Sequence, residues 1–383
     1  MKFNFSLFLI LFSVAISPAQ SIDTLSFFSP VFDQTRTVYI HKPDIYKYKS
    51  DTLKMPVVYL LDGQHEWFVN PILSDIEYLQ NTHEIPNALV VVIPLLDRRK
   101  ECEIGDLKME LPLHKFITQE LKHELERYNH GDLRVLIGHS FSASFSLYSF
   151  LHEPEHYSAV FAHSPLDQMD KLLEELNKST QQDQEKIYLS VGGISPDKDH
   201  YHRKNYNRLK TEFPEFFMNV NTFEADNSAH NAVPIVANPW FLTEFFSGFK
   251  GRYSKIAEVD EEYLLIEQPD SLEAEMTKLL SLSKINDQPY PPEIADLYGI
   301  ASRYSYNGYK EYARKVYELG IEFFPNFYGF HLSLYEQLIS KNAQKAKQHL
   351  NKAEVLLNTI DKDLENKNEL LEAIKNARSK NGW

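Results

Sequence analysis

The residues best suited to chemistry lie in the run RVLIGHSFSA, residues 134–143. A short apolar stretch leads into Ser140, and a helix-forming stretch follows it. A serine at a tight strand-to-helix turn takes a strained backbone conformation that holds its hydroxyl above the sheet. Gly138 supplies one of the small neighbours that such a turn needs, whereas Ser142 stands where a second glycine is usual. The segment therefore predicts a nucleophile elbow with Ser140 as the nucleophile.

A serine hydroxyl needs a proton acceptor at neutral pH, and histidine is the usual one. The chain contains 15 histidines. His230 follows the last predicted strand in a polar loop and comes after Ser140, which is the chain order of this type of triad. We therefore predict His230 as the general base. His139, next to the nucleophile, is expected to have a structural or substrate-lining role.

The acid of a triad would orient the imidazole and stabilise its charged form. The predicted strand 187–191 ends in two glycines, and Asp197 and Asp199 follow before the next helix. This position fits the order serine, acid, histidine. Asp197 is the first choice and Asp199 the second. Asp226 and a serine–histidine pair without an acid stay open.

An oxyanion intermediate needs two N–H donors. The run VVYLLDGQ, residues 57–64, is a predicted strand that ends in a glycine turn, at the place in chain order where one donor is usually found. The N–H of Gln64, or that of Gly63, is the first predicted donor. The N–H of Phe141, at the start of the helix after the nucleophile, is the second.

A metal site is the alternative for the histidines and aspartates near residue 200. His200 and His202, with Asp197 and Asp199, include the ligand types that zinc prefers. No cysteine and no H-E-x-x-H helix accompanies them. We therefore expect no metal at this position.

The chain has a regular organisation from Ile22 to residue 250. Short β-rich runs alternate with helical stretches, which predicts a mostly parallel sheet with helices on both faces. The predicted strands are 37–40, 57–61, 89–95, 135–137, 159–162, 187–191 and 220–223, and the predicted helices are 114–128, 141–151, 201–213 and 234–246.

Helical periodicity replaces the strand pattern after Gly251. Residues 251–288 are expected to form a linker, and residues 289–383 a helical extension. Two helical pairs align at a spacing of about 33 residues, with Ala313 opposite Ala346. This region resembles a pair of tetratricopeptide repeats. The resemblance implies a surface for a protein partner or support for a lid, and a packed helical tail without a ligand is the alternative.

Composition and charge exclude some function classes. The formal net charge of −14 disfavours nucleic acid as a partner. Residues 1–19 combine a basic start, an apolar run and small residues near the end, which predicts a secretory signal and an exported protein, periplasmic or secreted. No later stretch reaches the roughly 20 apolar residues of a spanning helix. Cys102 is the single cysteine, so an internal disulfide is excluded.

These segments together resemble the putative esterase family related to esterase D and the enterochelin esterases. The segments VVYLLDGQHEWF, VLIGHSFSASFSLYSFLHEPEHYSAVFAHSP, IYLSVGG and SAHNAVP occur in the order of that family, over about residues 25–250. The resemblance implies an α/β-hydrolase three-layer sandwich, ester hydrolysis without a cofactor, and catalytic roles for Ser140 and His230. It also implies that Trp67 lies near the substrate.

The leading hypothesis is an exported serine esterase that cleaves small-molecule carboxylic esters through an acyl-enzyme, with siderophore or acylated-carbohydrate esters as possible substrates. Because Ser142 replaces the usual glycine, a catalytically weak hydrolase-fold protein that binds a ligand or a protein is the alternative.

Overall fold

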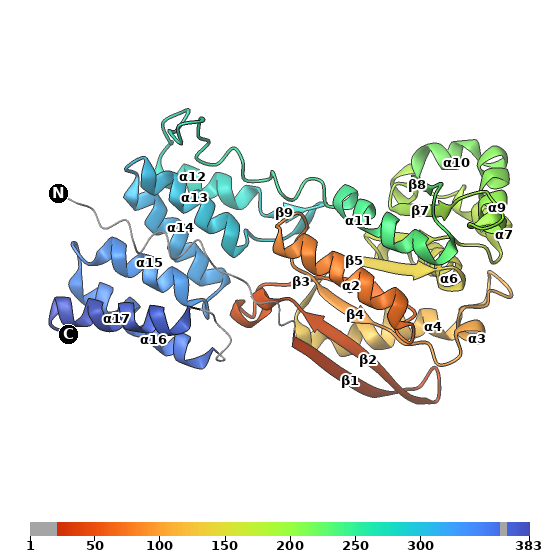
Figure 1. Cartoon of the computed structure of the whole chain (residues 1–383), viewed down its shortest axis with the longest axis horizontal. Coiled ribbons are helices and arrows are strands. Elements are labelled where there is room, and N and C mark those ends of the chain that lie inside the picture. The colour runs from red at the N-terminus through yellow and green to blue at the C-terminus, as the bar shows by residue number, and fades with distance from the viewer. Residues whose placement is uncertain (1–20, 361–365) are drawn as a thin grey trace. The chain divides into compact units, whose positions relative to one another are not determined.

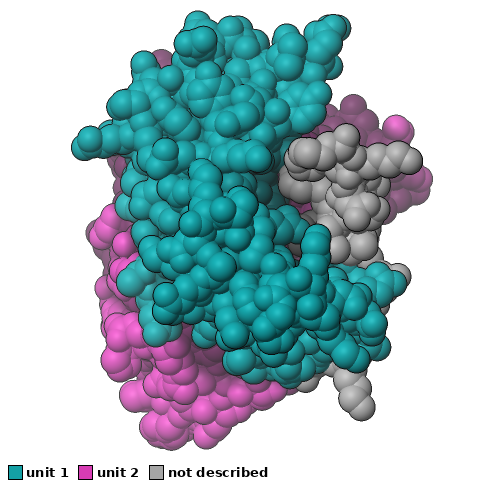
Figure 2. Space-filling model, turned by 90° about the vertical axis from the view of Figure 1, so that its left-hand side faces the viewer, with its two compact units in different colours: residues 1–19, 44–53, 251–383 teal, residues 20–43, 54–250 magenta. Residues whose placement is uncertain are grey.

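The computed structural model describes residues 21–360 and 366–383. The predicted secretory signal, residues 1–19, lies outside them. The chain forms two compact units, coloured separately in Figure 2. The first, which we call the sheet unit, comprises Gln20–Pro43 and Lys54–Lys250. The second, which we call the helical unit, includes Asp44–Leu53 and Gly251–Trp383.

The sheet unit is built on an eight-stranded sheet (Figure 1). Its order is β1-β2-β4-β3-β5-β6-β7-β8. The pairs β1/β2 and β2/β4 are antiparallel, and every later pair is parallel. This is the α/β-hydrolase fold that the sequence predicted. The strands are β1 (Ser21–Ser29), β2 (Gln34–Lys42), β3 (Met55–Leu60), β4 (Leu89–Val92), β5 (His130–His139), β6 (Ala159–His163), β7 (Ile187–Gly192) and β8 (Asn221–Ala225).

Burial explains why the central strands read as continuous apolar runs. Every residue of β3, β4, β6 and β7 is buried, because helices cover both faces of a parallel sheet. The strand β1, which lies at the edge, alternates between exposed and buried residues over part of its length. The sequence prediction did not include this strand.

Helices cover the sheet, and α2 and α11 pack against each other (Figure 1). The predicted helix 114–128 is a succession of short helical segments with a π-helical turn at Phe116–Leu121. The helix α2 was not predicted. The helices of the unit are α2 (Glu66–Asn81), α3 (Arg98–Cys102), α4 (Pro112–Lys115), α5 (Lys122–Leu125), α6 (Phe141–His152), α7 (Met169–Leu176), α8 (Gln181–Gln184), α9 (His200–Glu212), α10 (Pro214–Asn219) and α11 (Val233–Phe245).

The helical unit consists mainly of consecutive helices that pack on their neighbours, from α13 to α17. The short segment Asp44–Tyr48 joins this unit, where the Tyr48 ring packs edge-on against Phe327. The predicted helical extension is confirmed, and its assignment as tetratricopeptide repeats stays a prediction. The elements are α12 (Leu272–Ser281), β9 (Lys284–Ile285), β10 (Gln288–Pro289), α13 (Ile294–Tyr306), α14 (Lys310–Phe323), α15 (Tyr328–Leu338), α16 (Ala343–Thr359) and α17 (Lys367–Asn381).

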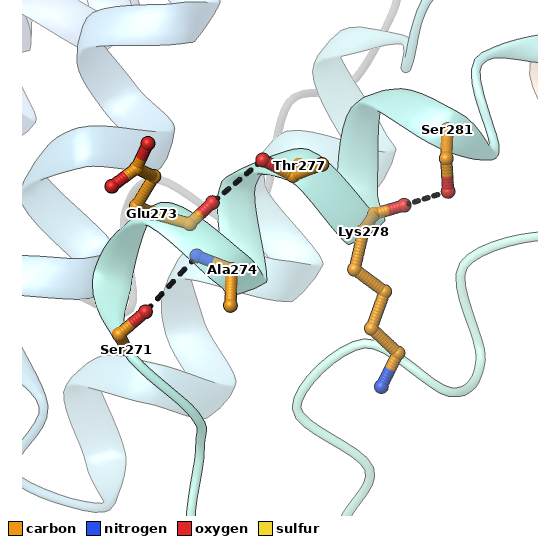
Figure 3. Close-up of a pocket in the computed structure, with 6 residues that line it drawn as sticks. All are labelled: Ser271, Glu273, Ala274, Thr277, Lys278 and Ser281. Atoms are coloured by element: carbon orange, nitrogen blue, oxygen red, sulfur yellow. Dashed lines mark hydrogen bonds between the residues drawn. The ribbon is translucent and has the colours of Figure 1, made fainter.

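A surface depression in the helical unit runs along α12 and is shown in Figure 3. Its polar groups make local helix bonds: Ser271 Oγ accepts from the Ala274 N–H, and the Thr277 hydroxyl donates to the Glu273 carbonyl. Nothing in it resembles a catalytic centre. Within the described part of the chain, no helix has the length and apolar content of a membrane span.

Candidate active site

The turn at Ser140 has the strained geometry of a nucleophile elbow. Strand β5 ends at His139, α6 begins at Phe141, and Ser140 between them has φ 59° and ψ −115°. A non-glycine residue rarely adopts such a positive φ. A Cβ on Gly138 would lie 2.4 Å from the Ser142 carbonyl oxygen, so glycine is needed where the strand meets the helix. The Ser140 N–H donates to the His163 carbonyl at 2.8 Å, which ties the turn to β6.

The serine in place of the second glycine is part of a buried network. Ser142 is fully buried, and its hydroxyl lies 2.6 Å from Asp62 Oδ2. The same hydroxyl accepts from the His139 N–H at 2.8 Å. Ser142 therefore connects the elbow to the residue that precedes the glycine turn after β3.

The Asp62 carboxylate also binds Arg98, at the start of α3. Arg98 Nε and Nη2 donate to the two carboxylate oxygens at 2.5 and 3.0 Å. Nη2 also donates to the His139 carbonyl at 2.6 Å. Bidentate charged pairs of this kind hold their partners in a fixed geometry. Arg98 thus ties together the loops after β3, β4 and β5.

Two amides near the elbow are suited to bind an oxyanion. The Gly63 N–H donates to the Ile93 carbonyl at 3.0 Å and is therefore occupied. Among the described residues, the N–H groups of Gln64 and Phe141 have no backbone acceptor. The Gln64 side chain is fixed because its Oε1 accepts from the Leu95 N–H at 2.8 Å. Of the two predicted alternatives after β3, the geometry favours Gln64 over Gly63.

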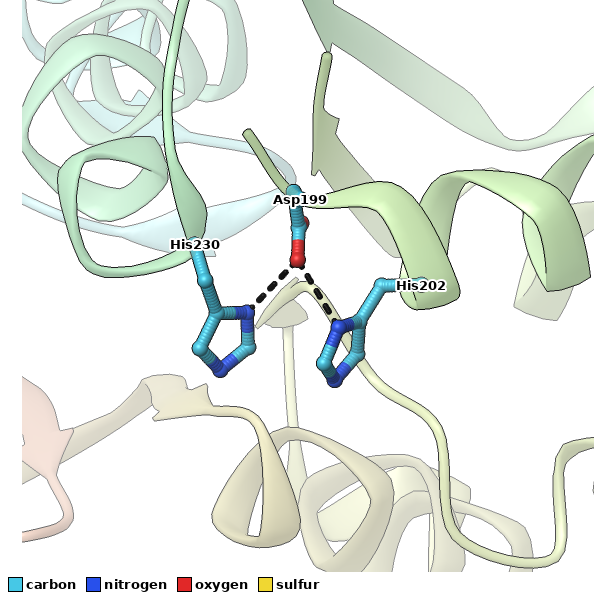
Figure 4. Close-up of side chains that lie close together, drawn as sticks. All are labelled: Asp199, His202 and His230. Atoms are coloured by element: carbon cyan, nitrogen blue, oxygen red, sulfur yellow. Dashed lines mark hydrogen bonds and ion pairs between the residues drawn. The ribbon is translucent and has the colours of Figure 1, made fainter. Parts of the chain in front are cut away.

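The predicted base is paired with a buried carboxylate (Figure 4). His230 Nδ1 lies 2.8 Å from Asp199 Oδ1, and the Asp199 side chain is fully buried. Its other oxygen accepts from the Ser164 hydroxyl at 2.6 Å and from the Gly192 N–H at 3.0 Å. Burial alone would raise the pKa of Asp199, but the bonds from His202, His230, Ser164 and Gly192 lower it well below its usual range. Asp199 is therefore an ionised acceptor.

The first choice for the acid, Asp197, lies elsewhere in the loop. Its side chain is 72% exposed and binds Ser195 and Lys198 instead of the base. Asp226 is exposed as well and pairs with Arg203. The acid that the structure brings to His230 is thus the second choice, Asp199. This N-cap residue of α9 has a buried carboxylate that binds Ser164, Gly192 and His230.

His139, next to Ser140 in the chain, binds the main chain of His230. It is 2% exposed, and its Nε2 donates to the His230 carbonyl at 3.1 Å. The two rings are 4.4 Å apart between centroids. Burial, with His230 and His163 nearby, lowers the pKa of His139 to about 2, so the ring is neutral. With so little exposed surface, His139 is better placed to position His230 than to contact a substrate.

Trp67 lies at the start of α2, beside the elbow, and its role toward a substrate stays a prediction. It is 47% exposed, and its ring packs edge-on against His139 with centroids 6.0 Å apart. An exposed indole beside the elbow is available to a ligand.

The sequence prediction did not include His202 among the site residues. Its Nδ1 lies 2.8 Å from the same Asp199 oxygen that binds His230, and the two rings stack with centroids 4.1 Å apart. The spacing Asp-x-x-His at a helix start was the available signal. Asp199, His202 and His230 could also hold a cation, since their ligand atoms lie within 4.8 Å of one another. As arranged, protons on both Nδ1 atoms satisfy the carboxylate.

Residues 29–217 match the family described as "Putative esterase". The match covers just under half of the chain and includes the loop after β3 and the elbow, whereas His230 lies beyond its end. None of the curated proteins matches the sequence.

Two solved structures with TM-scores above 0.5 show the same fold at low identity. An IroE-like serine hydrolase from Shewanella oneidensis is 17% identical, with 78% of this chain and 98% of that chain covered and a TM-score of 0.58. An uncharacterised protein from Capnocytophaga ochracea is 16% identical, with 93% and 100% covered and a TM-score of 0.54. An enterochelin esterase from Shigella flexneri is 19% identical, with 59% and 58% covered and a TM-score of 0.47.

Proposed function

We propose that the protein is a serine hydrolase that cleaves carboxylic esters through an acyl-enzyme, with Ser140, His230 and Asp199 as its triad. The observation that carries the proposal is the combination of a strained Ser140 with a His230–Asp199 pair that His139 holds against the elbow. The family match of residues 29–217 supports the reaction class.

The geometry assigns a tautomer to the base. An ionised Asp199 only accepts hydrogen bonds, so His230 Nδ1 carries a hydrogen and Nε2 has the free lone pair. In the proposed reaction, Ser140 Oγ attacks the ester carbonyl and its proton passes to His230 Nε2. The Gln64 and Phe141 N–H groups would stabilise the oxyanion.

The first half ends with the acyl-enzyme, and water then releases the acid in the second half. The alcohol leaves with the proton from His230, and Ser140 keeps the acyl group as an ester. His230 then takes a proton from water, whose oxygen attacks the acyl carbon. The bond between that carbon and Ser140 Oγ breaks, Oγ takes the proton back from His230, and the carboxylic acid is released. Asp199 stabilises the imidazolium in both halves.

Exposed apolar side chains suggest part of the substrate. Large hydrophobic residues with 37–65% exposure occur in the loops or at the helix starts that follow strands β3, β4, β5, β6 and β7. The carboxyl ends of parallel strands meet at one edge of a sheet, so these residues follow the same edge as the elbow. They favour an ester with an apolar or aromatic group, which includes aryl siderophore and feruloyl-type carbohydrate esters. The residues are Trp67, Leu96, Phe141, Leu166 and Ile194.

The test is covalent labelling together with turnover. A fluorophosphonate probe should label the mature protein, and a panel of aryl acetates, octanoates and siderophore or sugar esters should show hydrolysis. Ser140→Ala should abolish both signals, whereas Ser195→Ala, in an exposed loop, should keep both. An active Ser140→Ala variant would disprove the mechanism, and a folded protein without labelling would favour the alternative of a binding protein.

Export is a separate part of the proposal and rests on the pattern of residues 1–19. The amino-terminal sequence of the protein recovered from a periplasmic or culture fraction would test it.

A further inference from the structure

We propose that His202 is a positioning residue of the catalytic centre, a second imidazole that holds both the acid and the base; this inference rests on the proposed function. It follows from the contacts of one side chain at the start of α9.

His202 shares an acceptor atom with the base. Asp199 Oδ1 lies 2.8 Å from Nδ1 of His202 and 2.8 Å from Nδ1 of His230. The Asp199 side chain is fully buried, so water cannot replace a lost donor. Ser164 and Gly192 bind Oδ2, and His202 is the second donor on Oδ1 beside His230. Loss of the His202 donor would leave this side of a buried carboxylate with one partner fewer, at a cost in free energy. His202 therefore helps to keep Oδ1 directed at His230.

His202 also restricts the base itself. Its ring stacks on His230 at 4.1 Å with an interplanar angle of 20°, and the His139 ring lies 4.4 Å from His230. His230 is thus in contact with two imidazoles, and its own side chain is only 27% exposed. Rings that are packed in this way lose the freedom to swing away from the nucleophile.

The helix start supports a dedicated role for these residues. Asp199 is the N-cap residue of α9, yet its side chain makes no capping hydrogen bond. A helix normally gains stability from such a cap. Here the carboxylate accepts hydrogen bonds from Ser164, His202 and His230 instead. His202 can reach it because residues three apart at a helix start lie on the same face.

His139, the last residue of β5, contacts the main chain of the base directly. The contact of His139 with the His230 carbonyl places His230 on the side of the elbow. His202 packs on His230 as well, through its own ring stack. We therefore assign proton transfer to His230 and orientation to His202.

Two substitutions separate the hydrogen bond from the ring stack. His202→Asn can keep an N–H donor at the position of Nδ1 but removes the ring, whereas His202→Phe keeps the ring but removes the donor. We expect His202→Phe to lower kcat about 10-fold to 100-fold with KM within about twofold, and His202→Asn to retain more activity than His202→Phe. His200→Ala is the matched control. His200 lies on the same turn of α9 as His202, but it binds the Ile194 carbonyl and not Asp199.

A spectroscopic measurement distinguishes positioning from general damage. Proton NMR of the resting enzyme should show two downfield imidazole N–H signals from His202 and His230. His202→Phe should remove one signal and shift the other. Thermal unfolding of each variant shows whether it is folded.

The outcomes separate this inference from the proposed function. An inactive Ser140→Ala together with an unchanged kcat in folded His202→Phe would overturn the role of His202 and leave the esterase mechanism in place. Activity in His230→Ala with its loss in His202→Ala would also overturn it, because His202 would then be the base. Activity in Ser140→Ala would remove the basis of both.

Discussion

Ser142, which stands where a glycine usually follows such an elbow, allows a sharp prediction. If Ser142 is a poor substitute for glycine, Ser142→Gly should raise activity and leave stability unchanged. The contacts of its hydroxyl lead us to expect the opposite. The hydroxyl has one hydrogen, and its nearer acceptor is the charged Asp62 carboxylate at 2.6 Å.

The magnitude follows from those contacts. A hydrogen bond to a charged group contributes about 1.5–3 kcal/mol, and the His139 N–H would lose its acceptor as well. Glycine within α6 adds a conformational cost of about 0.5–1 kcal/mol. We expect Ser142→Gly to lower the free energy of unfolding by about 3 kcal/mol. For a unit of this size, Tm should fall by roughly 6–12 °C.

Calorimetry and ester hydrolysis test this expectation together. Ser142→Ala should show most of the Tm decrease of Ser142→Gly, since the lost hydroxyl contacts contribute more to that decrease than the flexibility of glycine. Ser146→Ala is the control, because the Ser146 hydroxyl is also buried in α6 but donates only to the Ser142 carbonyl. A Ser142→Gly variant with an unchanged Tm and a higher kcat would refute the reasoning and identify the serine as a defect.

Two further predictions concern the acid and the buried histidines. Asp199→Asn should lower kcat on the order of 10³–10⁴-fold, because an amide cannot select the required tautomer of His230. Asp197→Asn should keep kcat within about twofold of the parent value, because Asp197 binds Lys198 and not the base. Equal losses of kcat in steady-state assays of the two variants would contradict the assignment of the acid. The pKa is lowered by burial to about 2 for His139 and about 3 for His163, so between pH 6.5 and pH 3 only the unfolded chain binds these protons. Stability should therefore fall as pH decreases below 6.5, by up to about 1.4 kcal/mol per pH unit for each histidine. Urea unfolding at several pH values should show this decrease in the free energy of unfolding, and the decrease should be smaller in His163→Leu. A free energy of unfolding that does not change between pH 6.5 and pH 3 would contradict the prediction.

The sequence was sufficient for the fold and the elbow for a physical reason. Strands buried on both faces require continuous apolar runs, and the turn at Ser140 requires a small residue at Gly138. Both requirements are local and can be read from the order of residues. The helix α2 escaped prediction because it contains Pro71, which usually ends a helix.

The choice between neighbouring acids could not be read from the sequence. Asp197 and Asp199 are two residues apart in one loop, and the direction of each side chain depends on hydrogen bonds made after folding. Gly192 and Ser164, from two different strand ends, fix Asp199. The pairing of His202 with the same oxygen depends on that orientation too, so neither could be derived from spacing alone.

The shared attachment of three loops to Asp62 and Arg98 has a consequence for protein engineering. A loop transplanted from a relative would arrive without the matching carboxylate, guanidinium or hydroxyl, and would leave a buried charge uncompensated. Substrate range in this scaffold should therefore be altered by exchanging the outward-facing apolar side chains one at a time, with the loop backbones left intact.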